Sequence, residues 1–293
     1  MPRPSCVVHV WDLPGEKRPR FTSPLGVGSV VRLVSDAAGL THMGVNVRVV
    51  DPGKAGTNRH YHAVEEEWTY VLAGRGTVRI GSHRLPVRAG SFVGFPPGPR
   101  PHHFLADAGE PLVLLDGGER RRDEDYGFYP DLGLRFSLTT GLTPVTEPLP
   151  PEGGEASQCV HLDDLVPFEV HHDVDPRARR TMRLLHWPSG LKRQAVYWAR
   201  VDAGARTTAF HTHLHTDEWI YVLAGRARLR IGEQTLDVGA NDFIAHPAGG
   251  AAHLMEPAEA LTYLVGGEID SEDVVVYPDA RLRRVHGQLE PLP

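Results

Sequence analysis

Residues 60–76 read HYHAVEEEWTYVLAGRG, and residues 211–227 read HTHLHTDEWIYVLAGRA. Each stretch has a pair of alternating histidines, a glutamate five residues later and a glycine seven residues after the glutamate. Aromatic and aliphatic residues fill the same positions between them. One chain therefore carries the same local pattern twice, and this repetition decides how the rest of the sequence is interpreted.

The repetition continues beyond these two stretches at one constant separation. His211 follows His60 by 151 residues, and His253 follows His102 by the same number. A period near 150 residues is much longer than a solenoid or propeller unit and indicates two copies of a whole domain. We therefore predict two domains, with an exposed linker rich in Pro, Gly and Glu between them. The predicted boundaries are 1–145 for the first domain, 146–157 for the linker and 158–293 for the second domain.

The composition excludes several classes of protein. The chain has 293 residues, 41% of them hydrophobic, which is enough for two ordinary domain cores. A formal charge of -6 gives no electrostatic basis for binding nucleic acid or an anionic membrane. No apolar run reaches the roughly 20 residues of a membrane-spanning helix, and the first residues lack a signal-peptide pattern. We expect a soluble, cytoplasmic protein whose two cysteines, Cys6 and Cys159, are reduced and structural.

Short runs rich in β-branched and aromatic residues indicate an all-β chain. They are separated by Gly or Pro turns, and helical periodicity over ten or more residues is scarce. The runs occur in matching order in the two halves: 45–50, 68–74, 77–81, 92–95 and 111–118, then 195–201, 219–225, 228–232, 243–246 and 261–267. Many short strands at close spacing predict a small antiparallel sandwich or barrel in each half.

The strand pattern places the repeated histidines and glutamates together. Side chains alternate between the two faces of a strand, so His60 and His62 point the same way. Glu67 comes five residues after His62, so in one straight strand its side chain would point to the opposite face. A bend in the polar residues before Glu67 would return its side chain to the face of the histidines. His102 or His103 then arrives from a later strand. The repeat favours His102, because it corresponds to His253 whereas His103 corresponds to a leucine.

Three imidazoles and one carboxylate form a donor set for a divalent transition metal. Taken singly, each element has a simpler interpretation, since His-x-His can be two ordinary side chains and the EEE run a solvated turn. A histidine with a purely structural role, however, has no reason to recur in both halves at the same spacing from three other residues. The predicted ligands are His60, His62, Glu67 and His102 in the first half and His211, His213, Glu218 and His253 in the second. By ligand type, the metal could be Mn, Fe, Ni, Co, Cu or Zn.

These residues resemble the two sequence motifs of the cupin superfamily, repeated as in a bicupin. The first motif, Gly-x5-His-x-His-x3–4-Glu-x6-Gly, is matched from its first His onward, and its leading Gly is displaced by one position to Gly53 and Gly204. The second motif, Gly-x5-Pro-x-Gly-x2-His-x3-Asn, is matched at Gly90, Pro96, Gly98 and His102, and at Pro247, Gly249 and His253. Asn241 replaces its first Gly in the second half, and Ala106 and Pro257 replace its final Asn.

The resemblance implies two tandem double-stranded β-helices, or jelly-roll barrels, with a metal inside each. It also implies a homodimer or the two-domain equivalent of one. Cupins include dioxygenases, oxalate decarboxylases, isomerases, storage proteins and ligand sensors, so the fold does not choose a reaction. We expect a metal-dependent enzyme acting on a small oxygen-rich metabolite, with a dioxygenase-type reaction as the first expectation. The alternative is a non-catalytic small-molecule binding or storage bicupin in which the metal is structural or anchors a ligand.

Residues that share a face with the ligands are candidates for lining a substrate pocket. Their identities differ between the halves, which indicates that the two barrels differ in role. Two recurring arginines could contact an anionic substrate, although solvated strand residues explain them equally well. The candidates are Thr69 and Phe104 in the first half, Ile220 and Met255 in the second, and the arginines Arg79 and Arg230.

Overall fold

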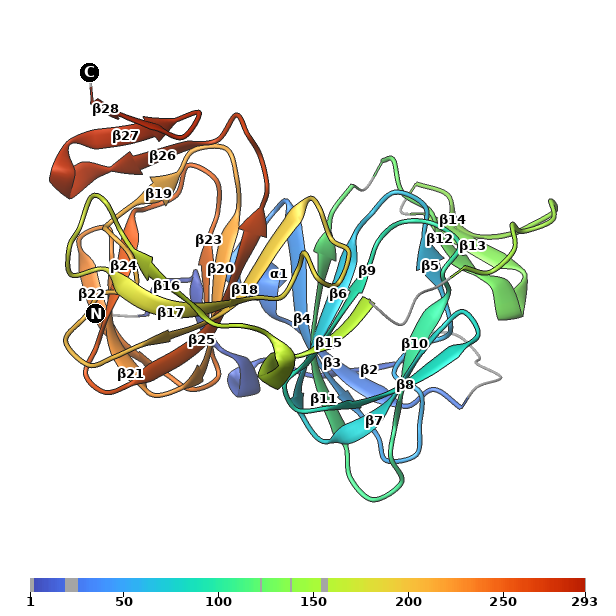
Figure 1. Cartoon of the computed structure of the whole chain (residues 1–293). Helices are drawn as coiled ribbons and strands as arrows, with labels where there is room; N and C mark the ends of the chain where they lie inside the picture. The colour runs from blue at the N-terminus through green and yellow to red at the C-terminus, as the bar shows by residue number, and fades with distance from the viewer. Residues whose placement is uncertain (1–2, 19–25, 122, 138, 154–157, 293) are drawn as a thin grey trace.

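The chain folds into two β-barrels that lie side by side (Figure 1). The computed structural model describes residues 3–18, 26–121, 123–137, 139–153 and 158–292. Within these ranges every pairing between named strands is antiparallel, and the strands form six sheets, three in each barrel. The all-β prediction and the jelly-roll arrangement are thereby confirmed.

The N-terminal barrel contains sheets of seven, three and four strands within the described residues. The large sheet has the order β15 (Cys159–His161), β9 (Ser91–Phe95), β6 (Glu67–Ala73), β11 (Leu112–Glu119), β4 (Met43–Val50), β3 (Ser29–Leu33) and β2 (Glu16–Arg18). The three-stranded sheet has the order β10 (His102–Ala106), β7 (Arg75–Ile80) and β8 (His83–Arg88). The four-stranded sheet has the order β14 (Gly141–Pro144), β13 (Leu134–Ser137), β12 (Gly127–Tyr129) and β5 (Tyr61–His62).

The C-terminal barrel repeats this plan. Its large sheet has the order β1 (Val7–His9), β23 (Asp242–His246), β20 (Glu218–Ala224), β25 (Leu261–Glu268), β18 (Gln194–Val201), β17 (Arg179–Leu184) and β16 (Phe168–His171). The three-stranded sheet has the order β22 (Gln234–Gly239), β21 (Arg226–Ile231) and β24 (His253–Pro257). The four-stranded sheet has the order β19 (Thr212–His213), β26 (Val274–Tyr277), β27 (Leu282–Val285) and β28 (Gln288–Pro291).

Helices are few and short within the described residues. The helix α1 spans only Val34–Ala38, and the remaining helical turns are 3-10 helices. These are η1 (Val10–Asp12), η2 (Pro130–Leu132), η4 (Leu162–Asp164) and η5 (Pro278–Ala280). None of the described helices has the length and apolar character needed to cross a membrane.

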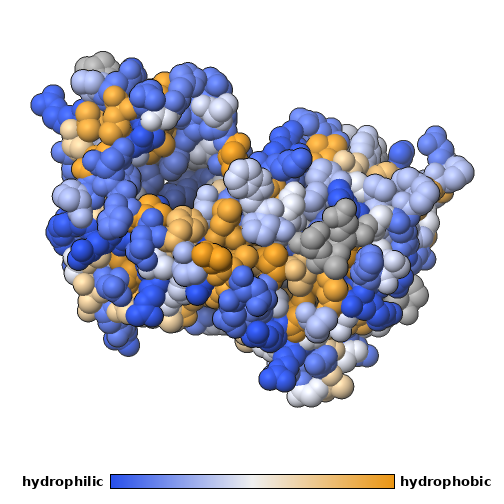
Figure 2. Space-filling model, viewed as in Figure 1, coloured by the Kyte–Doolittle hydropathy of each residue, from blue (hydrophilic) through white to orange (hydrophobic). Residues whose placement is uncertain are grey.

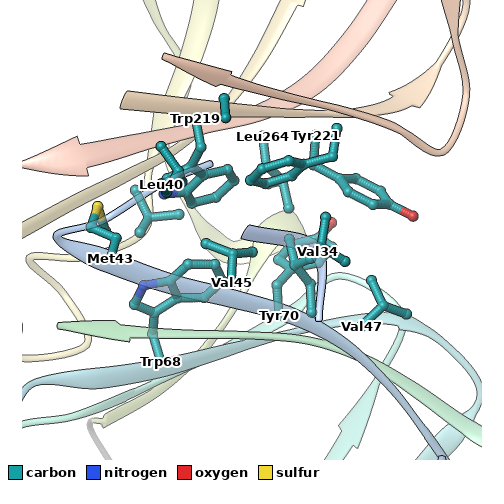
Figure 3. Packing of buried hydrophobic residues seen from close by; sticks show 14 of the residues in the cluster. Val34, Leu40, Met43, Val45, Val47, Trp68, Tyr70, Trp219, Tyr221 and Leu264 are labelled. Atoms are coloured by element: carbon teal, nitrogen blue, oxygen red, sulfur yellow. The ribbon is translucent and has the colours of Figure 1, made fainter. Parts of the chain in front are cut away.

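A shared hydrophobic core joins the two barrels. Trp68 of β6 and Trp219 of β20 stack with ring centroids 5.1 Å apart, and both side chains are fully buried. Figure 3 shows these rings with Val45, Tyr70 and Tyr221 between strands of the two halves. In Figure 2 the exposed hydrophobic residues gather around the middle of the molecule, and the left lobe is hollowed below β26–β28. Because the barrels share one core, we expect them to unfold as one unit.

The two halves also exchange a strand, which the sequence did not predict. Strand β1 lies at the edge of the large sheet of the C-terminal barrel, where Val7 pairs with Ile244. Strand β15 lies at the edge of the large sheet of the N-terminal barrel, where Cys159 pairs with Val93. Each half therefore extends the other's sheet and covers one of its edges. Of the predicted linker at 146–157, residues 154–157 lie outside the described residues.

The glycine that ends the repeated stretch occupies a tight turn in both halves. Gly74 and Gly225 follow β6 and β20 with φ angles of 84° and 87°, in the left-handed region that favours glycine. A Cβ atom at Gly74 would lie 2.2 Å from the carbonyl oxygen of Pro111, and one at Gly225 would lie 2.3 Å from that of Ala260. Both the backbone angle and the close approach therefore require glycine at these turns.

Cys159 of the exchanged strand β15 is expected to react slowly with alkylating reagents. Burial raises the pKa of its thiol to about 11, and only the thiolate is nucleophilic. At pH 8 the alkylation by iodoacetamide should therefore be roughly 100-fold slower than for an exposed cysteine, and it should accelerate as the pH rises toward 11. Peptide mass spectrometry with a free cysteine peptide as reference measures this rate. Equal rates for Cys159 and the peptide would contradict the burial of β15.

Candidate metal centre

The first cluster forms where strands of the N-terminal barrel meet. His62 lies on β5, and Glu67 begins β6 after a connection at residues 63–66 that bends at residues 63 and 64. His60 and His102 face each other across an antiparallel bridge closed by two backbone hydrogen bonds of 2.8 and 3.2 Å. The bend returns Glu67 to the face of the histidines, as the alternation of side chains along a strand requires.

The Nε2 atoms of three histidines surround the Glu67 carboxylate. Nε2 of His60 lies 3.6 Å from Oε2 of Glu67, and Nε2 of His102 lies 3.3 Å from the same oxygen. Nε2 of His62 lies 3.5 Å from Oε1 of Glu67. The next histidine, His103, follows His102 in β10 and belongs to the opposite face of that strand. The structure thus brings the four predicted residues of this half together.

The second cluster repeats the first in the C-terminal barrel. Nε2 of His211 lies 3.5 Å from Oε2 of Glu218, and Nε2 of His253 lies 2.8 Å from it. The ligand atoms of His211, His213 and Glu218 all lie within 4.8 Å of one another. His211 and His253 again form an antiparallel bridge. Both halves therefore offer three imidazole nitrogens and one carboxylate, which suit a divalent transition metal.

The outer nitrogens of five of these six rings are held by hydrogen bonds, whereas Nδ1 of His253 is buried without a partner among the described residues. Nδ1 of His62 bonds Oδ2 of Asp125, and Nδ1 of His213 bonds Oδ2 of Asp273, both at 2.5 Å. Three further Nδ1 atoms donate to backbone carbonyls: His60 to Asn58 at 2.9 Å, His102 to Arg100 at 3.1 Å and His211 to Ala209 at 3.0 Å. A proton on Nδ1 leaves the lone pair on Nε2, the atom that faces the cluster. This arrangement of outer partners is typical of metal-binding histidines.

The electrostatics of both clusters suit a cation. Burial alone would raise the pKa of Glu67, but the surrounding imidazoles outweigh burial and hold it well below its usual range. The same balance holds the pKa of Glu218 low. Burial lowers the pKa of His102, and it lowers that of His253 to about 4. In contrast, the neighbouring carboxylates outweigh burial and raise the pKa of His62 to about 9, and they also raise the pKa of His213. Each cluster therefore presents an ionised carboxylate, and a metal would displace a proton from His62 and from His213 as it binds.

Asp125 and Asp273 were not identified from the sequence. They lie 148 residues apart, the separation also found between Tyr129 and Tyr277, rather than the 151 residues of the ligand set. Each aspartate comes four residues before its tyrosine, and this later register was the signal that could have revealed them. Charged residues surround Asp125 in the sequence, which is typical of a solvated surface segment, yet its side chain is buried.

Replacing Asp125 with asparagine should weaken metal binding in the N-terminal barrel by about 10–100-fold. Asparagine keeps the shape of the side chain but removes the charge that orients His62 and makes its ring more basic. Competition with a chelator measures the affinity of that barrel. The matched control is Asp123→Asn, which removes an exposed carboxylate two residues away and should leave the affinity unchanged. Equal affinity of the Asp125 variant and the native protein would contradict this role.

A polar cavity lies beside the first cluster. It has a volume of about 210 Å³, and its wall includes His60, Glu67 and His102. The polar part of the wall is a hydrogen-bonded group in which Arg48 Nε donates to Asp116 at 2.7 Å and Thr69 Oγ1 donates to Asp116 at 2.9 Å. Asn46 also contributes to this wall, while Phe95, Phe104 and Leu114 form its apolar part. The predicted pocket residues Thr69 and Phe104 thus lie beside the metal-site candidates.

The interior of the C-terminal barrel is apolar at the corresponding positions. By strand register Thr69 corresponds to Ile220, Phe104 to Met255, Arg48 to Ala199 and Asp116 to Val265. These four residues of the C-terminal barrel are buried in one hydrophobic cluster. The predicted candidates Ile220 and Met255 are therefore interior residues that pack against aliphatic neighbours. The two barrels share a ligand set but differ in the space beside it.

The two recurring arginines lie on the outer faces of their strands, and neither belongs to the wall of the cavity beside the first cluster. Val78 and Ile80 point into the barrel, so Arg79 between them faces outward, where its Nε donates to the carbonyl of Gly81 at 2.9 Å. Arg230 forms an ion pair of 2.6 Å with Asp279 at the surface. The two arginines recur because they occupy corresponding positions on the outer faces of β7 and β21.

Comparison with known proteins agrees with this architecture. The Cupin domain family matches the chain in two regions, residues 46–117 and 197–265. The chain therefore belongs to the cupin superfamily and, with two matching regions, is a bicupin. No curated protein gave a significant match.

Several solved structures share the fold over most of the chain. A mutant of Bacillus subtilis oxalate decarboxylase is 17% identical, with a TM-score of 0.61 over 92% of this chain and 78% of that one. The Lactobacillus farciminis oxalate decarboxylase formate complex is 16% identical, with a TM-score of 0.60 over 89% and 85%. A Bacillus subtilis oxalate decarboxylase described for its Mn(II) centres is 18% identical, with a TM-score of 0.59 over 89% and 76%. Identities this low show the fold alone, and these structures give no support to the dioxygenase-type reaction expected first.

Proposed function

We propose that this bicupin is a metal-dependent enzyme whose N-terminal barrel acts on a small, oxygen-rich metabolite. The ligands of its metal would be His60, His62, Glu67 and His102, and the corresponding residues of the C-terminal barrel would hold a second metal. One observation carries the proposal: a polar cavity adjoins the first cluster, whereas apolar side chains occupy the same place in the second barrel. When bound, the metal would act as a Lewis acid on a substrate oxygen.

The cavity wall would orient the substrate. The guanidinium of Arg48 and the hydroxyl of Thr69 are both held by Asp116, so their positions are set before a ligand arrives. Preorganised polar groups of this kind bind oxygen atoms without the cost of reordering side chains. Phe95 and Phe104 form an apolar wall that would limit water near the metal. The small volume of the cavity favours a substrate of few atoms.

Two points guide the first choice of metal and substrate. The histidine and carboxylate donors suit Mn, Fe, Co, Ni, Cu and Zn, and one structure with this fold is described for its Mn(II) centres. Several solved structures that share the fold over most of the chain are oxalate decarboxylases. We therefore propose Mn(II) and small carboxylic acids for the first assays, with decarboxylation as the first reaction to measure.

The variant Thr69→Ile tests where the substrate binds. It places in the N-terminal barrel the residue that the C-terminal barrel carries, which fills the cavity and removes the hydrogen bond to Asp116. Mn-loaded protein is incubated with small carboxylic and hydroxy acids, and products are followed by NMR. Thr69→Ile should retain its metal and lose turnover by roughly tenfold or more, whereas the matched change Ile220→Thr should retain turnover.

Two results would argue against this proposal. Equal turnover by Thr69→Ile and the native protein would show that the cavity does not hold the substrate. Tight binding of a tested acid to the metal-loaded native protein, with no product across the whole panel, would instead support the non-catalytic binding or storage protein.

A further inference from the structure

An arginine reaches the same place in both barrels, but from different strands. In the N-terminal barrel, Nη1 of Arg48 on β4 donates to the carbonyl of Gly56 at 3.2 Å. In the C-terminal barrel, Nη1 of Arg180 on β17 donates to the carbonyl of Thr207 at 2.5 Å. Thr207 follows Gly56 by 151 residues, so the two carbonyls are equivalent. Each barrel therefore holds a guanidinium at this place, although the repeat does not align the two arginines.

Arg180 lies on the inner face of its strand and is partly buried. Met182, two residues later in β17, belongs to the hydrophobic cluster inside the C-terminal barrel, and alternation along the strand places Arg180 on the same side. Nε of Arg180 donates to the sulfur of Met182 at 3.1 Å. The residue that corresponds to Arg48 is Ala199, which has no polar side chain. The guanidinium of Arg180 therefore takes the place of that of Arg48.

The two guanidinium groups differ in their charge partners. Nε of Arg48 donates to the carboxylate of Asp116 at 2.7 Å, which neutralises its charge within the barrel. The residue that corresponds to Asp116 is Val265, and Arg180 forms no ion pair with a carboxylate among the described residues. A guanidinium in a protein is always charged, and a charge away from water is normally paired. Within the described part of the chain, an anionic partner is supplied to Arg48 and not to Arg180.

A buried hydroxyl group accompanies the Arg180 guanidinium. Tyr263 of β25 occupies the position of Leu114 in the other barrel, and its side chain is 1% exposed. Its hydroxyl has no hydrogen-bond partner among the described residues. Burial raises the pKa of Tyr263, the charge of Arg180 opposes this effect and the charge of Glu218 adds to it. The hydroxyl therefore lies near both the guanidinium and the second cluster.

The other side chains around this hydroxyl are apolar. Ile220, Met255 and Val265 belong to the same buried cluster as Tyr263. An inorganic anion would lose its hydration against such side chains, and they could not replace it. An organic carboxylate would instead bury its hydrocarbon part there and direct its charged group to the guanidinium. Figure 2 shows that this lobe is hollowed below β26–β28, which belong to the sheet that carries His213.

We propose that the C-terminal barrel binds a small organic carboxylate with an aliphatic body, whose charged group is held by Arg180 and Tyr263. This binding site goes beyond the proposed function, because it lies in the other barrel and does not depend on turnover. It also differs in kind from the cavity of the N-terminal barrel, where Asp116 already neutralises the arginine. The two barrels would then take ligands of different polarity.

Isothermal titration calorimetry of the intact protein tests this inference. Every protein in the comparison carries Thr69→Ile, which fills the cavity of the N-terminal barrel and so removes binding there. The probe is isovalerate, a branched monocarboxylate, and the comparison ligands are its neutral analogue isoamyl alcohol and inorganic phosphate. We expect isovalerate to bind at a single site in each chain, and roughly tenfold or more tightly than either comparison ligand.

Two substitutions remove the proposed contacts separately. Arg180→Gln removes the charge but keeps an amide donor, and it should weaken the binding of isovalerate by roughly tenfold or more. Tyr263→Phe removes only the hydroxyl and should weaken binding by roughly 3–10-fold. Arg179→Gln is the matched control, because it removes an exposed arginine of the same strand and should leave the affinity unchanged.

Three results would overturn the inference. The first is equal affinity of the Arg180→Gln and Arg179→Gln proteins for isovalerate. The second is phosphate binding as tight as isovalerate binding, and the third is no isovalerate binding to the parent Thr69→Ile protein. Because the titrations measure binding alone, lack of turnover in the native protein would contradict the proposed function without changing their outcome.

Discussion

Replacing Glu67 with glutamine is expected to abolish metal binding in the N-terminal barrel and to remove the turnover proposed there. Glu67 would supply the only carboxylate among the four proposed ligands, and three imidazole nitrogens lie within 3.6 Å of its oxygens. Glutamine has nearly the same size but carries no charge, so it cannot balance the charge of a divalent cation. We expect a loss of affinity of at least about 100-fold, equivalent to about 3 kcal/mol.

The measurement is the metal content of protein dialysed against a weak chelator. The native protein should hold about two metal ions and Glu67→Gln about one, because the C-terminal cluster is intact. Glu218→Gln is the matched change in that barrel. It should also remove one ion, but it should leave the turnover of the N-terminal barrel in place. Two ions in the Glu67→Gln protein would show that this cluster is not a metal site.

The three consecutive glutamates show how far the sequence could be interpreted. The repeat selected only Glu67, and the structure brings it to the histidines. The sequence around Glu65 and Glu66 is also typical of a solvated turn, yet both side chains form hydrogen bonds within the protein. Glu65 accepts a backbone hydrogen bond from Arg121, and Glu66 bonds the opposite half of the molecule. Their partners lie far away in the chain, and a partner of that kind leaves no local pattern.

The same reason explains what else the sequence did not reveal. Arg48 and Asp116 are single charged residues in separate strands, and only the pairing of β4 with β11 makes them one group. The strand exchange depends on contacts between the first residues of each half and the opposite barrel. The residues of the two clusters could be predicted because both copies keep the same spacing. The polar cavity is confined to one copy, so no second copy in the chain could mark its residues by a shared spacing.

Glu66→Ala is expected to lower the free energy of unfolding of the whole molecule by roughly 2–6 kcal/mol. The Glu66 side chain is 2% exposed, and its carboxylate accepts hydrogen bonds of 2.9 Å from the backbone amides of Lys192 and Arg193 in the other half. Alanine would leave both amides without this acceptor, at about 1–3 kcal/mol each. Glu66→Gln keeps one acceptor oxygen, so its effect should be smaller.

Urea unfolding of the metal-free protein measures the effect, followed by tryptophan fluorescence and by far-UV circular dichroism. Glu124→Ala is the control, because that glutamate lies nearby and is exposed, and it should change the free energy by less than about 0.5 kcal/mol. An unfolding midpoint for Glu66→Ala equal to that of the native protein would contradict the importance of this contact.

The symmetry of the contact extends the prediction to the second barrel and to the metal. Asp217 lies directly before the proposed ligand Glu218, as Glu66 lies directly before Glu67. It accepts hydrogen bonds of 3.0 and 2.8 Å from the amides of Thr41 and His42. Asp217→Ala should therefore destabilise the protein to a similar degree. Because each contact fixes the residue next to a metal-site carboxylate, both variants should also bind metal more weakly at the adjoining centre. Each barrel then depends on a loop of the other for the position of its own glutamate, and this explains why the two barrels should unfold together.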